Sequence, residues 1–299
     1  MFDGSTSRRI AVVANPGSGN AGIGLDAALN RLQRAGVATV RRPEGDGGIA
    51  RAVEAAGMEG YDIVLAGGDG TVNAALPALR KVDRPFGLLP MGTANDFART
   101  LGIPTDPEKA AAIVAAGHTR RIDMSTVNGH PFVNVASIGL AVEVALRHRG
   151  PRKRRLGVLN YPLVWWEAFR ATRPFRVRVT CDGTTIETRC IMLAVGNGRH
   201  YGGGLTIHED ARIDDGQLTL YFVKSAGSLQ LVKMLPAFFV GTLYRQERAV
   251  SLCGRRIRVE TRRAKRVDAD GEIVTETPAE FEIFPGALRV FAPLDEARA

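Results

Sequence analysis

The residues with the clearest chemical potential form a glycine-rich turn, Ala66-Gly-Gly-Asp-Gly-Thr-Val-Asn73, between an apolar run and a helical pattern. This order predicts a turn at the carboxyl edge of a parallel strand, where open α/β sheets bind ligands. Glycines let backbone N–H groups approach phosphate oxygens, and the start of the following helix adds partial positive charge. Asp69 would repel phosphates, so we expect it to position Mg²⁺ or to orient an acceptor hydroxyl. The simpler alternative is an Asp-Gly turn that binds nothing.

Two further turns strengthen the nucleotide hypothesis. Asn15-Pro-Gly-Ser-Gly19 follows the first predicted strand, and Pro90-Met-Gly-Thr-Ala-Asn-Asp-Phe97 follows the fourth. All three turns are expected at one edge of one sheet, where backbone amides, hydroxyls and side-chain amides together suit a nucleotide. The polar side chains of this predicted rim are Asn15, Ser18, Thr71, Asn73, Thr93 and Asn95.

Other nucleotide motifs are absent or weak in this sequence. The chain has no GxxxxGK[ST] pattern, which excludes a P-loop. Gly17, Gly19 and Gly22 spell GxGxxG after a strand, but the acidic candidates that would follow, Glu44 and Asp46, lie in a predicted loop instead of at a strand end. Phosphoryl transfer is therefore favoured over dinucleotide binding.

The elements around these turns predict an α/β fold in two parts. From Arg8 to about Gly117, short β-branched runs alternate with alanine-rich helical stretches, which indicates a parallel sheet covered by helices. From about Asp123, strands and Asp-Gly turns indicate antiparallel structure. We therefore expect an α/β nucleotide-binding domain over residues 1–122 and a mainly antiparallel β-sandwich domain over residues 123–299. Alternation predicts half-buried strands at 175–179, 217–221, 256–260 and 281–284.

The charge of the chain predicts an anionic partner. The formal net charge is +9 and the pI is about 9.9. A basic run from Arg147 to Arg155 precedes an apolar helical segment, residues 156–170, that carries Trp165 and Trp166, and this pairing suits docking on an anionic membrane. A solvated loop followed by a core helix is an equal alternative. No nucleic-acid motif accompanies the charge, so nucleic-acid binding is not expected.

Cysteine usage and hydropathy bear on location. The three cysteines lie far apart and show no CxxC spacing, which fits a reducing compartment. The segment from Met1 to Arg9 is charged where a signal peptide is apolar. The most apolar stretch, Leu229 to Tyr244, is interrupted by Lys233 and Pro236 and falls short of the ~20 apolar residues that span a bilayer. We expect a cytoplasmic protein, peripheral at the inner membrane face, and the sequence leaves its oligomeric state open.

Three segments in order carry a family resemblance: GGDGTVN at 67–73, PMGTANDFART at 90–100 and GNGRHYGGG at 196–204. With them the chain resembles the diacylglycerol-kinase catalytic family, especially bacterial soluble lipid kinases related to sphingosine kinases. The resemblance covers roughly Arg8 to Pro293. It implies an α/β nucleotide domain followed by a β-rich domain that receives the lipid substrate. The implied reaction transfers the γ-phosphate of ATP to a lipid hydroxyl of the diacylglycerol, phosphatidylglycerol or sphingoid type.

The resemblance also implies roles for individual catalytic residues. Asp69 is expected to be essential for activity. Glu272, in the Asp270-Gly-Glu272 segment, is implied as the general base that takes the proton of the acceptor hydroxyl, a role open to a carboxylate within hydrogen-bond reach. On turn statistics alone, an exposed Asp-Gly hairpin is the alternative. The implied catalytic residues are Glu272, Asp69 and Asp270.

The same resemblance implies sites for ATP and Mg²⁺ as cofactors. A structural Mg²⁺ is implied at Asp215 with the backbone carbonyls of Arg212 and Gln217, a mixture of oxygen ligands that suits a hard cation. A simple Asp-Gly hairpin turn is the alternative there. The implied nucleotide-binding residues are Asn15, Ser18, Gly67, Gly68, Asp69, Gly70, Thr71, Val72, Asn73, Thr93, Asn95, Arg99 and Arg155.

Two other functions stay open at the level of the sequence. A nicotinamide-nucleotide kinase shares a GGDG turn and ATP chemistry, although the NDFAR and GNGRHYGGG segments are more typical of lipid kinases. A noncatalytic membrane-binding protein that senses nucleotide would bind ATP tightly without turnover on any lipid. A kinase assay over a panel of lipids separates these alternatives from a lipid kinase.

Overall fold

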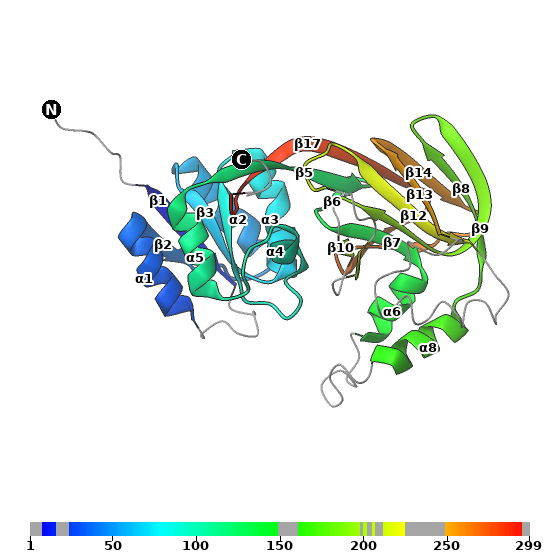
Figure 1. Ribbon diagram of the computed structural model, residues 1–299, viewed down its shortest axis with the longest axis horizontal. Coiled ribbons are helices and arrows are strands. Elements are labelled where there is room, and N and C mark those ends of the chain that lie inside the picture. Colours follow the sequence, from blue (N-terminus) through cyan, green and yellow to red (C-terminus); the bar gives the residue numbers. More distant parts are fainter. Residues whose placement is uncertain are drawn as a thin grey trace. The chain divides into compact units, whose positions relative to one another are not determined.

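The computed structural model describes residues 8–15, 24–148, 161–197, 200–201, 205–206, 212–224 and 249–294. These residues form two compact units, one built from residues up to Met124 and from Pro285 onward, the other from Ser125 to Phe284. The chain passes from the first unit to the second within strand β5 (Thr119–Val127) and returns within strand β17 (Ala279–Phe291) (Figure 1). No helix within the described ranges is both long enough and apolar enough to cross a lipid bilayer.

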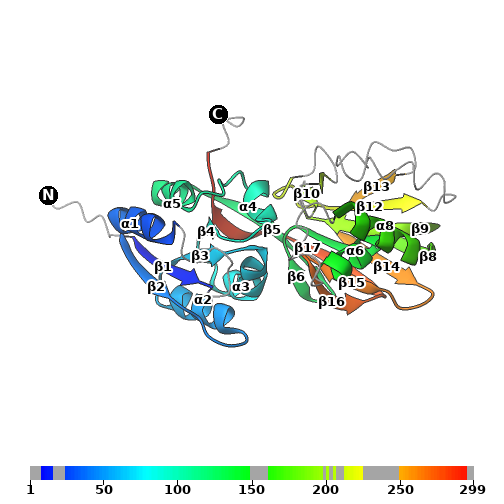
Figure 2. The same cartoon turned by 90° about the horizontal axis from the view of Figure 1, so that it is seen from below.

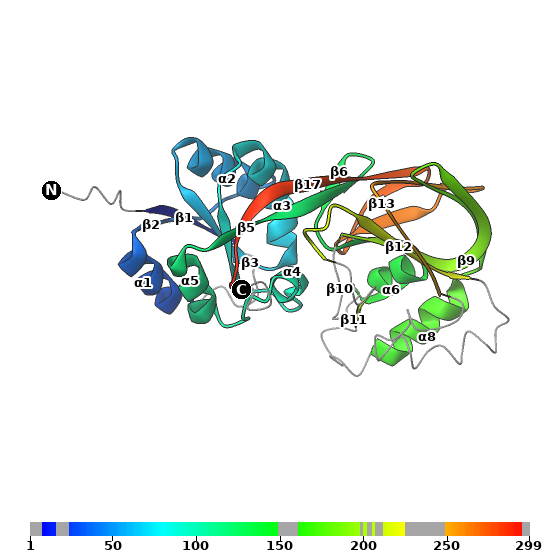
Figure 3. The same cartoon turned by 45° about the horizontal axis from the view of Figure 1, so that its top comes forward.

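The first unit is built on a parallel sheet in the strand order β2-β1-β3-β4. Helices α1 and α5 cover one face of this sheet and helices α2 and α3 the other (Figures 2 and 3). Both faces are covered, so the strands are continuous apolar runs, as in β1, where every residue after the first is buried. The elements are β1 (Arg9–Ala14), α1 (Leu25–Ala35), β2 (Val37–Arg41), α2 (Gly48–Met58), β3 (Asp62–Gly67), α3 (Asp69–Val82), β4 (Phe86–Pro90), α4 (Asp96–Thr100) and α5 (Pro107–Ala116).

Local sequence signals fix the ends of helix α5. Its N-cap is Asp106, whose carboxylate accepts hydrogen bonds from the backbone N–H groups of Glu108 at 2.9 Å and Lys109 at 3.0 Å. Pro107 occupies the first helical position, where the missing N–H costs nothing, and Gly117 ends the helix in the left-handed conformation. Such signals made this part of the fold predictable.

The second unit is antiparallel and β-rich. Its strands follow the order β16-β15-β7-β9-β8-β14-β17, with β12 pairing both β9 and β13. Strand β9 is long: Thr184 to Cys190 pairs with β8, and Met192 to Gly196 lies between β7 and β12. The elements are β6 (His130–Phe132), β7 (Val135–Gly139), α6 (Leu140–His148), α8 (Tyr161–Ala171), β8 (Phe175–Cys181), β9 (Thr184–Gly196), β10 (His200–Tyr201), β11 (Leu205–Thr206), β12 (Leu218–Lys224), β13 (Ala249–Gly254), β14 (Arg256–Thr261), β15 (Arg266–Ala269) and β16 (Glu272–Glu276).

The predicted fold class, a parallel α/β part followed by an antiparallel β-rich part, is confirmed. The prediction of a half-buried strand at 217–221 is wrong, because β12 is buried on both faces. Leu220 and Phe222 point into the main core of the unit, while Tyr221 and Val223 pack in a second apolar cluster with residues of helices α6 and α8. Alternation in sequence cannot reveal this second buried face, because the burial of Thr219 and Tyr221 depends on what packs against that side of the strand.

The carboxyl end of the chain differs from the continuous domain 123–299 expected from the sequence. Strand β17 runs on from the second unit, and its Val290 pairs in parallel with Phe86 of β4. Residues from Pro285 onward therefore cluster with the first unit. The apolar stretch at 229–244 lies outside the described residues, and of the predicted helix at 156–170 the structure describes only the part from Tyr161, in helix α8.

Candidate active site

The carboxyl ends of three neighbouring parallel strands bring the three predicted turns together in the first unit. Ala14 pairs with Ala66, and Gly67 pairs with Pro90, so β1, β3 and β4 end at the same edge. Backbone hydrogen bonds continue this alignment into the turns. Asn15 N–H donates to the carbonyl of Ala66 at 3.0 Å, and Met91 N–H donates to the carbonyl of Gly67 at 2.9 Å.

Glycines are required in two of these turns because neighbouring atoms leave no room for a Cβ. A Cβ on Gly92 would lie 2.7 Å from the Cα of Gly68, and a Cβ on Gly67 would lie 2.2 Å from the hydroxyl oxygen of Thr71. That hydroxyl is buried and accepts a hydrogen bond from the side-chain amide of Asn15 at 2.9 Å. Asn15 and Thr71, both predicted to border the nucleotide, thus also join the first two turns to each other.

The carboxylate of Asp69 holds the second and third turns together. It accepts hydrogen bonds from the backbone N–H groups of Asp96 at 3.2 Å and Phe97 at 3.0 Å, which open helix α4. Asp69 is also the first residue of helix α3, so its charge lies near the positive ends of two helices. The repulsion expected between this carboxylate and phosphates is therefore partly offset by backbone donors that the sequence did not reveal.

The side chain of Asn95 is used within its own turn. Its Oδ1 accepts from Gly92 N–H and its Nδ2 donates to the Gly92 carbonyl, each at 2.9 Å. Asn95 is buried and has a positive φ of 51°. Its side-chain amide therefore shapes the turn from inside, where we had predicted a nucleotide contact.

The remaining predicted nucleotide residues divide by exposure. Gly70, Thr93 and Arg99 are exposed at this edge, and Val72 is buried in the core. The Oδ1 of Asn73 is buried and makes no hydrogen bond within the described part of the chain. Such an orphaned acceptor fits a site completed by a ligand or its waters. Ser18 and Arg155 lie outside the described residues.

Two buried carboxylates of the first unit were missed by the sequence reasoning. Asp96, 8% exposed, begins helix α4, and Asp123, 2% exposed, accepts a hydrogen bond from Gly286 N–H at 2.8 Å. Their signal in the sequence is a charged residue inside an otherwise apolar segment, since buried charges are rarely tolerated without partners. Asp123 ties the returning end of β17 to β5.

The residues at this edge fit Mg²⁺ only in combination with a nucleotide. Among the described residues, no group of three or more histidine, cysteine or acidic side chains could hold a metal ion. Mg²⁺ bound through Asp69 would take phosphate oxygens and waters as its other ligands, which is its usual mode with nucleotides. The two oxygens of Asp69 each retain lone pairs beyond their one backbone hydrogen bond.

The Asp270-Gly271-Glu272 segment of the second unit forms a tight hairpin between β15 and β16. Asp270 and Gly271 have positive φ angles of 47° and 91°, and Ala269 pairs with Glu272 across the turn. The carboxylate of Asp270 accepts the backbone N–H groups of Val133, Asn134 and Val135 at 2.8, 3.0 and 2.8 Å. The hairpin is thus anchored to the segment that joins β6 and β7.

The side chain of Glu272, unlike that of Asp270, is exposed, and its carboxylate forms no ion pair or hydrogen bond with the residues that the structure describes. Its carboxylate is therefore available for proton transfer, while Asp270 determines where the hairpin lies. Asp270, predicted as a catalytic residue, uses its carboxylate to accept the backbone N–H groups that anchor the hairpin. The backbone of this segment does form the Asp-Gly hairpin that turn statistics alone predict.

A second anchor on the same segment was not assigned from the sequence. Asn197, in the GNGRHYGGG segment, is 1% exposed, and its Oδ1 accepts a hydrogen bond from the hydroxyl of Ser125 at 2.9 Å. Its Nδ2 donates to the Val133 carbonyl at 3.2 Å, and its backbone N–H donates to the Asn134 carbonyl at 2.9 Å. Asn197 and Asp270 therefore both hold residues 133–135 in place.

The predicted structural Mg²⁺ site is a compact turn before β12. The carboxylate of Asp215 accepts the backbone N–H groups of Arg212 at 3.2 Å and Gln217 at 2.9 Å. The chain therefore wraps around an exposed carboxylate. One carboxylate with nearby backbone carbonyls fits a hard cation that keeps several waters.

The basic run at 147–155, which we predicted to dock on a membrane, lies almost wholly outside the described residues. Its first residue, Arg147, forms an ion pair with Glu143.

Comparisons with known proteins cover both units. The family profile described as the diacylglycerol kinase catalytic domain matches residues 9–127, and the profile described as the YegS C-terminal NAD kinase beta sandwich-like domain matches residues 134–292. A diacylglycerol kinase of Mycobacterium tuberculosis is 34% identical, with 95% of each chain covered. One of Bacillus subtilis is 30% identical, with 97% of this chain and 98% of the relative covered. The crystal structure of a putative diacylglycerol kinase from Bacillus anthracis superposes with a TM-score of 0.83 at 26% identity, covering 98% of this chain and 99% of that one.

Proposed function

Because the chain belongs to the diacylglycerol kinase family, and is therefore an ATP-using phosphotransferase that acts on a lipid alcohol, we propose that its acceptor is diacylglycerol. The diacylglycerol kinases of Mycobacterium tuberculosis and Bacillus subtilis, which align over nearly the whole chain, support this acceptor over phosphatidylglycerol or a sphingoid base. The match of residues 9–127 to the diacylglycerol kinase catalytic domain also favours a lipid kinase over a nicotinamide-nucleotide kinase.

The proposed ATP site is supported by one observation above all: Asp69 and its neighbouring glycines join two turns at one edge of the sheet. In the proposal, the first unit binds ATP there, with the backbone of Gly68 to Gly70 approaching the phosphates and Arg99 supplying positive charge. Asp69 would hold Mg²⁺ or its waters. When bound, Mg²⁺ neutralises charge on the phosphates as the γ-phosphoryl group is transferred.

Glu272 is the proposed general base. The acceptor hydroxyl oxygen attacks the γ-phosphorus of ATP, and the bond from that phosphorus to the oxygen it shares with the β-phosphate breaks. The hydroxyl proton passes to the carboxylate of Glu272, and the products are ADP and a lipid phosphate. The exposed and unpaired state of Glu272 supports this role, because a base that is already hydrogen-bonded would have to exchange partners.

The test is turnover on a lipid panel. Purified protein with Mg-ATP and diacylglycerol should release ADP and form phosphatidic acid, identified by mass spectrometry. Asp69→Asn and Glu272→Gln should each lower kcat by at least 10²-fold, the usual scale for a general base or an electrostatic group. A preference for phosphatidylglycerol or a sphingoid base would overturn the acceptor. ATP binding without turnover on any lipid would overturn the enzymatic mechanism.

We further propose that the Asp215 turn binds a structural Mg²⁺ through its carboxylate and the carbonyls of Arg212 and Gln217. The measurement is the melting temperature of wild type and Asp215→Asn with and without millimolar Mg²⁺. Wild type should gain stability with Mg²⁺ and the variant should not. Equal gains in both proteins would refute the site.

A further inference from the structure

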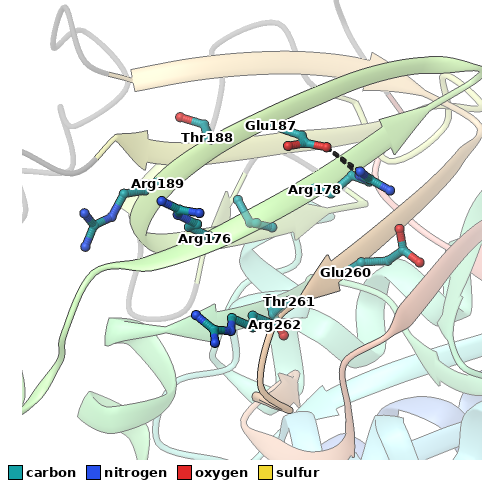
Figure 4. A pocket seen from close by; sticks show the side chains of 9 residues that line it. Arg176, Arg178, Glu187, Thr188, Arg189, Glu260, Thr261 and Arg262 are labelled. Atoms are coloured by element: carbon teal, nitrogen blue, oxygen red, sulfur yellow. Dashed lines mark hydrogen bonds and ion pairs between the residues drawn. The ribbon is translucent and has the colours of Figure 1, made fainter.

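A groove of about 550 Å³ lies on the outer face of the strands β8, β9 and β14 (Figure 4). Its origin is the alternation of β8, in which Phe175, Val177 and Val179 are buried and Arg176 and Arg178 are exposed. Nine residues line the groove: Arg176, Val177, Arg178, Glu187, Thr188, Arg189, Glu260, Thr261 and Arg262.

At one end of the groove the charges are balanced across the strands. Arg178 of β8 pairs with Glu187 of β9 and with Glu260 of β14. The guanidinium of Arg178 forms an ion pair with Glu187 at 2.5 Å, and this contact raises the pKa of Arg178. Opposite charges on neighbouring strands stabilise a sheet modestly.

The other end of the groove carries positive charge without acidic partners. Arg176 of β8 lies directly opposite Arg189 of β9, and Arg262 follows Thr261, the residue of β14 that pairs with Val177. None of the three arginines forms an ion pair within the residues that the structure describes, and all three are exposed. Like charges directly opposite each other destabilise a sheet. This cluster, Arg176, Arg189 and Arg262, is the arginine row.

The other arginines of β14 do have acidic partners on the same or a neighbouring strand. Arg256 forms an ion pair with Glu282 at 2.8 Å, and Arg258 pairs with both Glu260 and Glu280. The arginine row is therefore an exception on a sheet face whose charges are otherwise balanced. Because it costs stability in the isolated protein, folding does not explain it.

We propose that the arginine row docks the second unit on a membrane, where it binds the headgroups of anionic phospholipids. Guanidinium groups bind phosphate in a bidentate manner, and each basic residue near an anionic surface adds to the affinity. The inference rests on the proposed function, because a diacylglycerol acceptor resides in a bilayer. It assigns membrane contact to residues distinct from the basic run at 147–155.

The geometry favours a lipid surface over a dissolved phosphate. Strand β8 is hydrogen-bonded to β9 on one side and β14 on the other, so its backbone N–H groups are already used by the sheet. Sites for free phosphate usually draw on backbone N–H donors in a loop or at a helix start. Here only long exposed side chains reach the anion, and such side chains can spread across a flat array of headgroups.

The experiment measures binding to vesicles with the full chain. Vesicles of phosphatidylcholine with 30 mole percent, or with no, phosphatidylglycerol are sedimented with wild type and with Arg176→Gln/Arg189→Gln/Arg262→Gln. Loss of three arginines should weaken binding to the anionic vesicles on the order of 100-fold at low salt. The triple variant should melt at the same temperature as wild type or higher, because it removes repulsion between like charges.

The matched control removes the same three charges elsewhere. Arg31, Arg34 and Arg51 are exposed on helices α1 and α2, and their triple glutamine variant should bind anionic vesicles within about threefold of wild type. Equal losses in both variants would show that only net charge matters and would overturn the docking site. Competition by millimolar inorganic phosphate, at constant ionic strength, would assign the row to a dissolved phosphate instead.

A kinase assay separates this inference from the proposed function. With a short-chain, water-soluble diacylglycerol, the arginine-row variant should keep wild-type turnover, whereas on diacylglycerol in anionic vesicles its turnover should fall with its binding. Absence of turnover in wild type on both substrates would defeat the proposed function, and vesicle binding would still test the docking surface. Unchanged vesicle binding by the variant would defeat the docking surface alone.

Discussion

Replacing Asp270 with asparagine should disturb the position of Glu272, the proposed general base, and leave the chemistry of its carboxylate intact. The Asp270 carboxylate accepts three backbone N–H groups, with its two oxygens facing Val133 on one side and Asn134 and Val135 on the other. A carboxamide supplies only one oxygen. If that oxygen faces Asn134 and Val135, the new NH₂ group meets the N–H of Val133, which is also a donor.

The magnitude follows from these contacts. Loss of one hydrogen bond to a charged group costs about 1.5–3 kcal/mol, and an unsatisfied N–H adds about 1–3 kcal/mol. Asp270 is only half-buried, so we take the lower part of the summed range, about 2.5–4 kcal/mol. In a unit of this size, such a loss lowers the melting temperature by roughly 5–15 °C. A hairpin displaced by about 1 Å would lower kcat by on the order of 10²-fold.

The assay compares Asp270→Asn with Glu272→Gln, its neighbour two residues away. Calorimetry should show the melting transition of the second unit falling in Asp270→Asn and staying within about 1 °C of wild type in Glu272→Gln, whose carboxylate is exposed. Steady-state kinetics should show a lower kcat in both variants, with the KM for ATP changed less than about twofold, because neither residue belongs to the proposed nucleotide edge.

One pattern of results would refute this reasoning. If Asp270→Asn melted like wild type and lost activity as fully as Glu272→Gln, Asp270 would act on the substrate directly and its hydrogen bonds would be incidental. If Glu272→Gln kept wild-type kcat, the general base would be another residue.

Three further predictions rest on other parts of the chain. Gly92→Ala should raise the KM for ATP and destabilise the first unit by about 1–3 kcal/mol, because the Cβ of the new alanine would collide with the backbone of Gly68. An unchanged melting curve would contradict the close approach of residues 68 and 92. At pH 8 a thiol reagent should modify one cysteine per chain in the native protein, the exposed Cys253, and all three cysteines after unfolding. Burial raises the pKa of the thiols of Cys181 and Cys190, so these two should react slowly in the native protein; fast reaction of all three cysteines would contradict this. Two backbone N–H groups lower the pKa of Asp182, so its stabilising effect is present above the unfolded pKa of about 3.9 and is lost as pH falls through the lower folded value. The melting temperatures of wild type and Asp182→Asn should therefore differ at pH 6 and converge as the pH falls below the folded pKa of Asp182.

The order and type of the main elements could be predicted because their signals are local. Apolar runs such as Ile10 to Ala14, the capping residues of α5 and the Asp-Gly turns each specify backbone conformation within a few residues. The convergence of three turns at one sheet edge follows from the parallel connectivity alone. The second buried face of β12 was missed, because burial depends on what packs against a strand and not on the strand itself.

The chemical types at the candidate site were likewise visible in the sequence, but the partners of those residues were not. The hydrogen bonds of Asp69 reach Asp96 and Phe97, 27 and 28 residues away, and those of Asp270 reach residues 135 to 137 positions away. The arginine row exists only because the register of β8 and β9 sets Arg176 opposite Arg189. Contacts at such separations depend on how strands pair and loops pack, since a one-residue shift in register would move each side chain to the other face. By itself the sequence determined which groups are present and which turns carry them; the tertiary structure decided which carboxylates are held by the backbone and which charges are left to bind something else.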